Sequence, residues 1–115
     1  VQSNAELMPM AAVPVVVDKA GIVVDGELVV EFAKDGSIPS EQVSGHIIAS
    51  MREQLVKKKE EKEKLASMNS EVTFKGELII ICDNDVPFAV LRDVLMTAGD
   101  AEYGKFRFAV IKAKG

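Results

Sequence analysis

The feature that most constrains the fold is a buried strand, a sharp turn and an amphipathic helix in direct succession over residues 77–99. Residues 78–82 form a continuous apolar run, which suits a strand and is too short for a buried helix. Apolar side chains fall on both of its faces, so we expect both faces to be covered. A second apolar strand follows at residues 106–111. A strand, a helix and a strand of these lengths imply a right-handed parallel crossover.

The turn and the helix of this unit are predicted from their residue types. Three polar residues supply turn chemistry and an N-cap: Asp83, Asn84 and Asp85. Pro87 suits the first helical turn, where a missing N–H is not needed. The apolar stripe of the helix consists of Phe88, Leu91, Val94, Leu95 and Ala98. The helix ends at Gly99 or continues to the turn at Tyr103 and Gly104.

The last strand alternates between two faces. Phe106, Phe108 and Val110 share one face, and the other carries Arg107, Ala109 and Ile111. Nothing in the strand–helix–strand unit forms a residue set that would carry out chemistry. The unit therefore favours a binding or force-transmitting module over an enzyme.

The N-terminal half predicts a hairpin followed by a long helix. Residues 15–17 and 22–24 flank a turn, a second tight turn follows at Asp25, and residues 28–32 add a short strand. Ser40 is a good N-cap for a helix that begins at Glu41 and runs to about Met68. Its apolar stripe is Val43, Ile47, Met51 and Leu55, widened by Ile48 and Val56.

Beyond Val56 this helix becomes highly charged, with the run Lys57-Lys-Lys-Glu-Glu-Lys-Glu-Lys64. Lysines and glutamates four residues apart predict ion pairs along the helix: Glu60 with Lys64, Lys57 with Glu61, and Lys59 with Glu63. Residues 57–68 are interpreted as a solvated helical extension or, alternatively, as a partner-facing arm.

These elements predict a two-layer α/β (α+β) fold of order ββ(β)αβαβ, with two helices on one face of a small mixed sheet and a C-terminal parallel βαβ unit. We assign residues 1–5 to an expression-tag remnant, 6–13 to a linker and 14–112 to a single domain. The second sheet face is covered either by the helices or by a second copy of the domain.

Composition excludes several functional classes. A net charge of −4 and a pI near 5.0 give no reason to expect nucleic acid as a partner. The single cysteine, Cys82, cannot form an internal disulfide, and with one histidine, His46, the chain is too poor in ligands for a zinc site. Cys82 is interpreted as a small buried hydrophobe and His46 as a partly exposed helix residue. We predict no catalytic residue, no cofactor and no metal.

The chain resembles the periplasmic domain of the ExbD/TolR family. The pattern Asp-x-x-Val-Pro-aromatic, an apolar-striped helix ending near Ala-Gly and a short apolar strand fall at Asp83, Val86–Phe88, Leu91–Ala98 and Phe106–Phe108. The first hairpin is similar as well, from Pro14 to Gly26. The resemblance covers roughly residues 14–30 and 77–112.

The resemblance implies a role in biopolymer transport and energy transduction. Members of this family work beside an ExbB- or TolQ-like membrane protein, and they convey work driven by the proton-motive force to a TonB- or TolA-like transducer peptide. We therefore expect an inner-membrane, single-pass protein with this domain in the periplasm, acting as a homodimer. Expected contact residues are Val86, Pro87 and Phe88 at the turn and the edge formed by Phe106, Arg107, Phe108, Ala109, Val110 and Ile111.

Two alternatives belong to other classes. One is a peptidoglycan-binding module of a TolR-like or motility protein, which would need polar and aromatic groups along a groove. Aromatic residues make up only 5% of this chain, without tryptophan. The other is a small ligand-binding α/β domain, which would need a deep pocket with converging polar groups.

Overall fold

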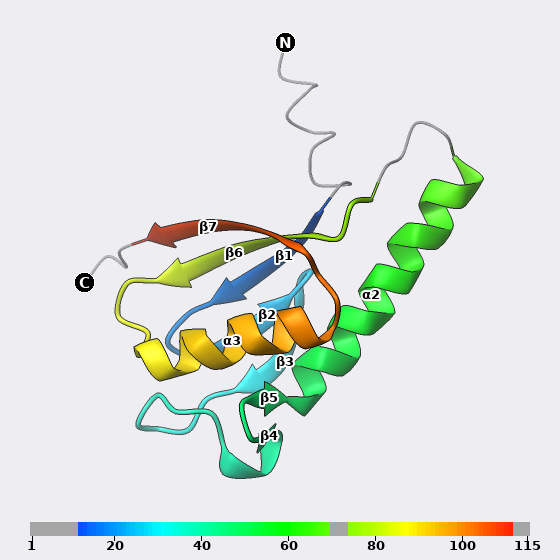
Figure 1. Cartoon of the computed structure of the whole chain (residues 1–115). Helices are drawn as coiled ribbons and strands as arrows, with labels where there is room; N and C mark the ends of the chain where they lie inside the picture. Colours follow the sequence, from blue (N-terminus) through cyan, green and yellow to red (C-terminus); the bar gives the residue numbers. More distant parts are fainter. Residues whose placement is uncertain (1–11, 70–73, 112–115) are drawn as a thin grey trace.

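The computed structural model describes residues 12–69 and 74–111 and shows a mixed sheet with two long helices (Figure 1). The sheet has five strands in the order β3-β2-β1-β6-β7. Their bounds are β1 Ala12–Val17, β2 Gly21–Val24, β3 Glu27–Glu31, β6 Glu77–Asp83 and β7 Lys105–Ile111. The long helices are α2 Ala49–Met68 and α3 Phe88–Asp100. A short segment between β3 and α2 contains η2 Ser40–Gln42, β4 Val43–Ser44 and β5 Ile47–Ile48.

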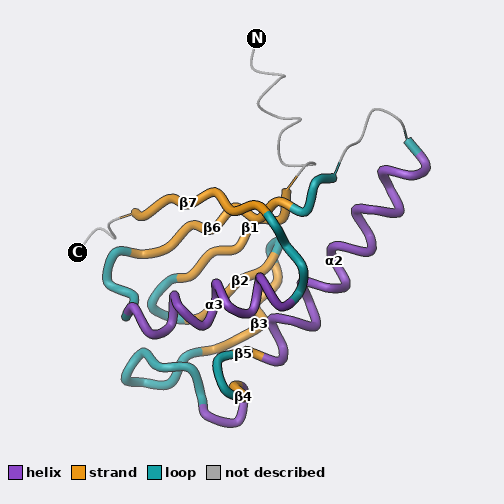
Figure 2. The backbone as a smooth tube through the Cα atoms, in the orientation of Figure 1, coloured by secondary structure: helices purple, strands orange, loops and turns teal. Residues whose placement is uncertain are grey.

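Strand pairing confirms the predicted sheet. β1, β2 and β3 form an antiparallel meander, while β1, β6 and β7 run parallel. The helix α3 connects β6 to its parallel neighbour β7, which confirms the predicted βαβ unit (Figure 2). The first strand begins at Ala12, two residues before the predicted domain boundary. The predicted tag, the rest of the predicted linker and the predicted last residue of the domain lie outside the described residues.

The core lies between the two helices and one face of the sheet. Every second residue of the central strands is fully buried, as period-two geometry requires: Val13, Val15 and Val17 in β1, and Leu78 and Ile80 in β6. The same buried cluster contains Met51 and Leu55 of α2 and Val90, Val94 and Ala98 of α3. Both helices therefore cover this inner face, in agreement with the predicted two-layer fold.

The opposite, outer face of the sheet has no helical cover in the described part of the chain. Pro14, Val16, Ile79 and Ile81 alternate with the core residues and are only half-buried. Of the two covers expected for the second face of residues 78–82, the helices do not supply it in this single copy, and cover by a second copy stays a prediction. A strand with apolar residues on both faces can therefore be covered on one face alone. The sequence of the strand does not specify which elements pack on each face.

The long helix begins eight residues later than predicted. Residues 43–48 form the small hairpin β4–β5 instead of helical turns. Gly45 occupies the left-handed region with φ +63°, and the buried N–H of Ile48 donates to Thr97 Oγ1 at 2.9 Å. This hydrogen bond joins residues far apart in the sequence. It favours the hairpin over the helix that the spacing of the apolar residues predicts. The predicted end at Met68 is confirmed.

Three details of α3 also differ from the prediction. No acidic side chain caps the helix; Pro87 occupies the N-cap position, and Asp83 Oδ1 accepts the N–H of Asp85 within the turn. Phe88, predicted in the apolar stripe, is 74% exposed. The helix passes Gly99 and ends at Asp100.

The predicted ion pairs along α2 do not form among the described residues. Lys58 instead pairs with Asp25 of the β2–β3 turn and with Glu61, each at 3.6 Å, and Lys59 reaches Glu102 beyond α3 at 3.6 Å. Lysines of α2 reach Asp25 and Glu102 because this part of the helix packs beside the body of the domain, whereas the pair of Lys58 with Glu61 lies within the helix. None of the helices in the described ranges combines the length and apolar character that crossing a bilayer demands.

Candidate functional site

The edge strand β7 exposes backbone hydrogen-bonding groups along one side. The N–H of Lys105 donates to Gly76 O at 3.3 Å, and Ile111 O accepts the N–H of Asn84 at 2.6 Å, so both end residues of β7 face β6. Because the direction of backbone groups alternates along a strand, the intervening Phe106, Phe108 and Val110 direct theirs to the open edge. Within residues 12–69 and 74–111 no strand pairs with this edge, which presents the N–H and C=O groups of these three residues.

The side chains of these same three residues are only partly covered. They lie beside buried residues of β6 in the sheet register, yet Phe106 is 44% exposed, Phe108 47% and Val110 56%. They are on the inner face, where the helices pack, but at the margin of the helical layer. Exposed aromatic groups beside an unpaired backbone are typical of a surface that binds an extended chain.

The helix α3 adds a second apolar wall on the same side. On its buried face, Asp93 and Thr97 contact the β4–β5 hairpin. Leu91 and Leu95 lie roughly 160° from Asp93 at 100° per residue, so they face away from that hairpin. In Figure 1 the hairpin lies on one side of α3 and β7 on the other. Phe88 extends this half-buried stripe toward the start of the helix.

The opposite edge of the sheet is protected. β3 has a register shift opposite Ile22 and Val23, carries glutamates at both ends, and is tied to α2 by a hydrogen bond from Gln54 to Glu27. Bulges and charged ends are the common devices that prevent strand addition. β7 has seven residues without a register shift or proline, so of the two sheet edges it is the one open to pairing.

The turn residues predicted as contacts lie at the carboxyl end of this edge. The hydrogen bond from Asn84 N–H to Ile111 O joins the β6–α3 turn to the end of β7. Val86 is half-buried against the core, whereas Pro87 and Phe88 are exposed. The structure therefore brings Phe88 and β7 to one side of the domain, and Val86 contributes mainly to packing.

The outward-facing side chains of β7 differ in character. Arg107 forms an ion pair with Glu77 of β6, Ala109 is exposed, and Ile111 is 51% exposed. An added strand would thus meet aromatic groups on the inner side and a cation on the outer side. Because the two sides of the strand differ in this way, the affinity of the edge for an extended segment would depend on the side chains of that segment.

The single cysteine, Cys82, and the single histidine, His46, occupy structural positions. Burial and the charge of Asp83 raise the pKa of the Cys82 thiol, which disfavours the reactive thiolate. His46 is not a helix residue but lies in the β4–β5 turn, where Nδ1 is 3.0 Å from the buried Asp93 Oδ1. Within residues 12–69 and 74–111, no group of three metal-binding side chains gathers.

Leu91 and Leu95 pack against the core, as the predicted stripe implies, but sequence reasoning missed their place on the half-buried flank of α3 that faces away from the hairpin. The signal was present in the spacing of Phe88, Leu91 and Leu95, which defines a flank distinct from Val90, Val94 and Ala98. Comparisons with models of protein families, with curated proteins and with solved structures found nothing that matches this chain.

Proposed function

We propose that this domain is a docking head of an ExbD/TolR-like energy-transduction complex, and that it receives an extended segment of a TonB- or TolA-like transducer on β7. The proposal places the domain in the periplasm, beside an ExbB- or TolQ-like partner of the inner membrane. The observation that carries it is the open edge of β7, with its free backbone groups and half-exposed Phe106 and Phe108.

Strand addition suits a domain that must transmit force. The backbone hydrogen bonds along an added strand share the applied force. The side chains of alternate residues supply specificity. Here an incoming segment would place every second side chain against Phe106, Phe108 and the α3 flank. No deep polar pocket is required, which is consistent with a role in binding instead of catalysis.

The same surface supports homodimerisation. Two β7 edges can pair across a twofold axis, and the open outer face of the sheet offers apolar area that a second copy could bury. In that arrangement a transducer segment and the second copy would compete for one edge, or the dimer would create the groove in which the segment lies.

The substitution Phe108→Lys tests the docking edge. A lysine on an edge strand disfavours the addition of another strand, and this substitution also removes a half-exposed aromatic side chain. We therefore expect it to weaken binding of a transducer-derived extended peptide by about tenfold or more. Fluorescence anisotropy of the labelled peptide measures the affinity, and circular dichroism checks the fold. Ala109→Lys, on the outer side of the same strand, is the matched control and should weaken binding less. Equal affinity of Phe108→Lys and the unmodified domain would contradict the proposal.

A further inference from the structure

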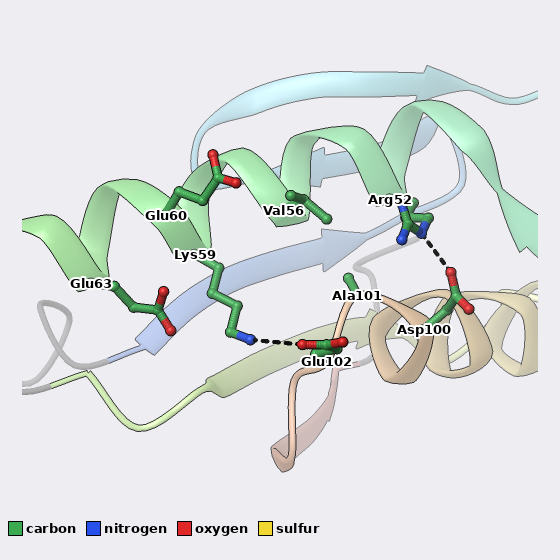
Figure 3. A pocket seen from close by; sticks show the side chains of 8 residues that line it. All are labelled: Arg52, Val56, Lys59, Glu60, Glu63, Asp100, Ala101 and Glu102. Atoms are coloured by element: carbon green, nitrogen blue, oxygen red, sulfur yellow. Dashed lines mark hydrogen bonds and ion pairs between the residues drawn. The ribbon is translucent and has the colours of Figure 1, made fainter.

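A second surface lies on the opposite flank of α3, along α2. Two open cavities of about 310 and 630 Å³ adjoin α2, and Arg52 and Val56 line both of them. The smaller cavity lies between α2 and the end of α3, and the larger between α2 and the β4–β5 hairpin. Figure 3 shows the smaller cavity, with Val56 and Ala101 between the charged side chains. Because they share Arg52 and Val56, the two cavities adjoin, and together they are called the α2 groove.

The floor of the α2 groove is apolar. Ile47 comes from the hairpin, Val56 from the middle of α2, and Ala101 from the turn after α3. Ile47 and Val56 are half-buried, and Val56 also packs against the hydrophobic core. A shallow groove with apolar residues on its floor fits the apolar face of a helix better than a small polar ligand.

The rim of the α2 groove carries an excess of negative charge. Its two cations are already paired across the groove: Arg52 with Asp100 at 2.5 Å and Lys59 with Glu102 at 3.6 Å (Figure 3). Three further carboxylates line it and have no cation within ion-pair distance among the described residues: Glu53, Glu60 and Glu63. The unpaired charge of the rim is therefore entirely negative.

We propose that the α2 groove docks an amphipathic helix of a partner protein, with apolar side chains on its inner face and lysine or arginine along its flanks. The apolar floor would contact the apolar face of the partner helix. Glu53, Glu60 and Glu63 would pair with the lysine or arginine side chains on its flanks. This surface is separate from β7, since the buried face of α3 lies between them. The domain then contacts two partner segments of different kinds, an extended strand at β7 and a basic helix along α2.

The test uses a designed helical peptide as the probe. A peptide of about 14 residues spans about 21 Å and carries leucines on one face and lysines on both flanks. Amide shifts of the whole domain are recorded on titration up to about 1 mM peptide. We expect shifts along residues 47–63 and 100–102, and weaker binding when ionic strength rises from about 20 to about 200 mM.

Matched variants decide whether the α2 groove is the site. Glu60→Gln with Glu63→Gln should weaken binding roughly three- to tenfold. Glu31→Gln removes one exposed charge of the same kind on β3, outside the α2 groove, and should leave the affinity unchanged where Glu60→Gln alone weakens it. A scrambled peptide of equal charge, or spermine, that binds as tightly as the patterned peptide would overturn the proposal, because charge alone would then explain binding. Absence of shifts along α2 would overturn it too.

Discussion

Replacing Ile80 by alanine is expected to destabilise the domain by about 2–5 kcal/mol, the usual cost of removing most of a fully buried aliphatic side chain. Ile80 is on the central strand pair, is fully buried, and lies beside Val15 in the register. Neither helix can move toward the vacated space without losing contact with the remaining core. Urea unfolding followed by circular dichroism measures the free energy of unfolding.

The matched control is Ile79→Ala, one residue away on the half-buried outer face. For an isolated copy we expect less than about half the cost of Ile80→Ala, since less area leaves contact with protein. If a second copy covers the outer face, the cost of Ile79→Ala grows with protein concentration, because dimer formation contributes to stability. Equal costs for the two variants at low concentration would contradict the one-sided core.

Replacing Gly21 by alanine is expected to cost about 1–3 kcal/mol or more, because the added methyl group has no space. A Cβ at Gly21 would lie 2.1 Å from the backbone oxygen of Val30 and 3.2 Å from a side-chain atom of Leu28. The oxygen belongs to β3, so relief would require β2 and β3 to separate. Thermal and urea unfolding of the variant measure the loss.

Gly99→Ala provides the control with the opposite sign. Gly99 lies in α3, and a Cβ there meets nothing within 4 Å. We expect a gain of about 0.5–1 kcal/mol, the usual difference in helix propensity between alanine and glycine. If Gly21→Ala were as stable as Gly99→Ala, the close approach of β2 and β3 would be wrong.

The elements that were predicted correctly are those whose residue pattern lies within the element itself. The apolar run at 78–82, the alternation at 106–111 and the first hairpin all became strands of the expected sheet. The helix at residues 41–48 was wrong because its competitor is tertiary: the hydroxyl of Thr97, distant in sequence, holds the N–H of Ile48. No spacing pattern within that segment records such a contact.

The candidate site was predicted in part. The resemblance implied a contact edge at residues 106–111, and β7 is an edge strand of the sheet, but the partner of its inner face depends on where α3 lies. The α2 groove was missed because Val56 was assigned to an apolar stripe and Lys59 and Glu63 to a separate charged run, while Arg52 was assigned to neither. Their spacing of four, three and four residues instead places them along one face of α2.

Amide hydrogen exchange along β7, with and without the extended transducer peptide, tests the docking edge most directly. In the free domain, the N–H groups of Phe106, Phe108 and Val110 should exchange faster than those of Arg107 and Ala109, which face β6. The peptide should slow exchange at the first three residues and leave the other two nearly unchanged. Exchange at Phe106, Phe108 and Val110 that stays fast when the peptide is saturating would contradict strand addition at β7.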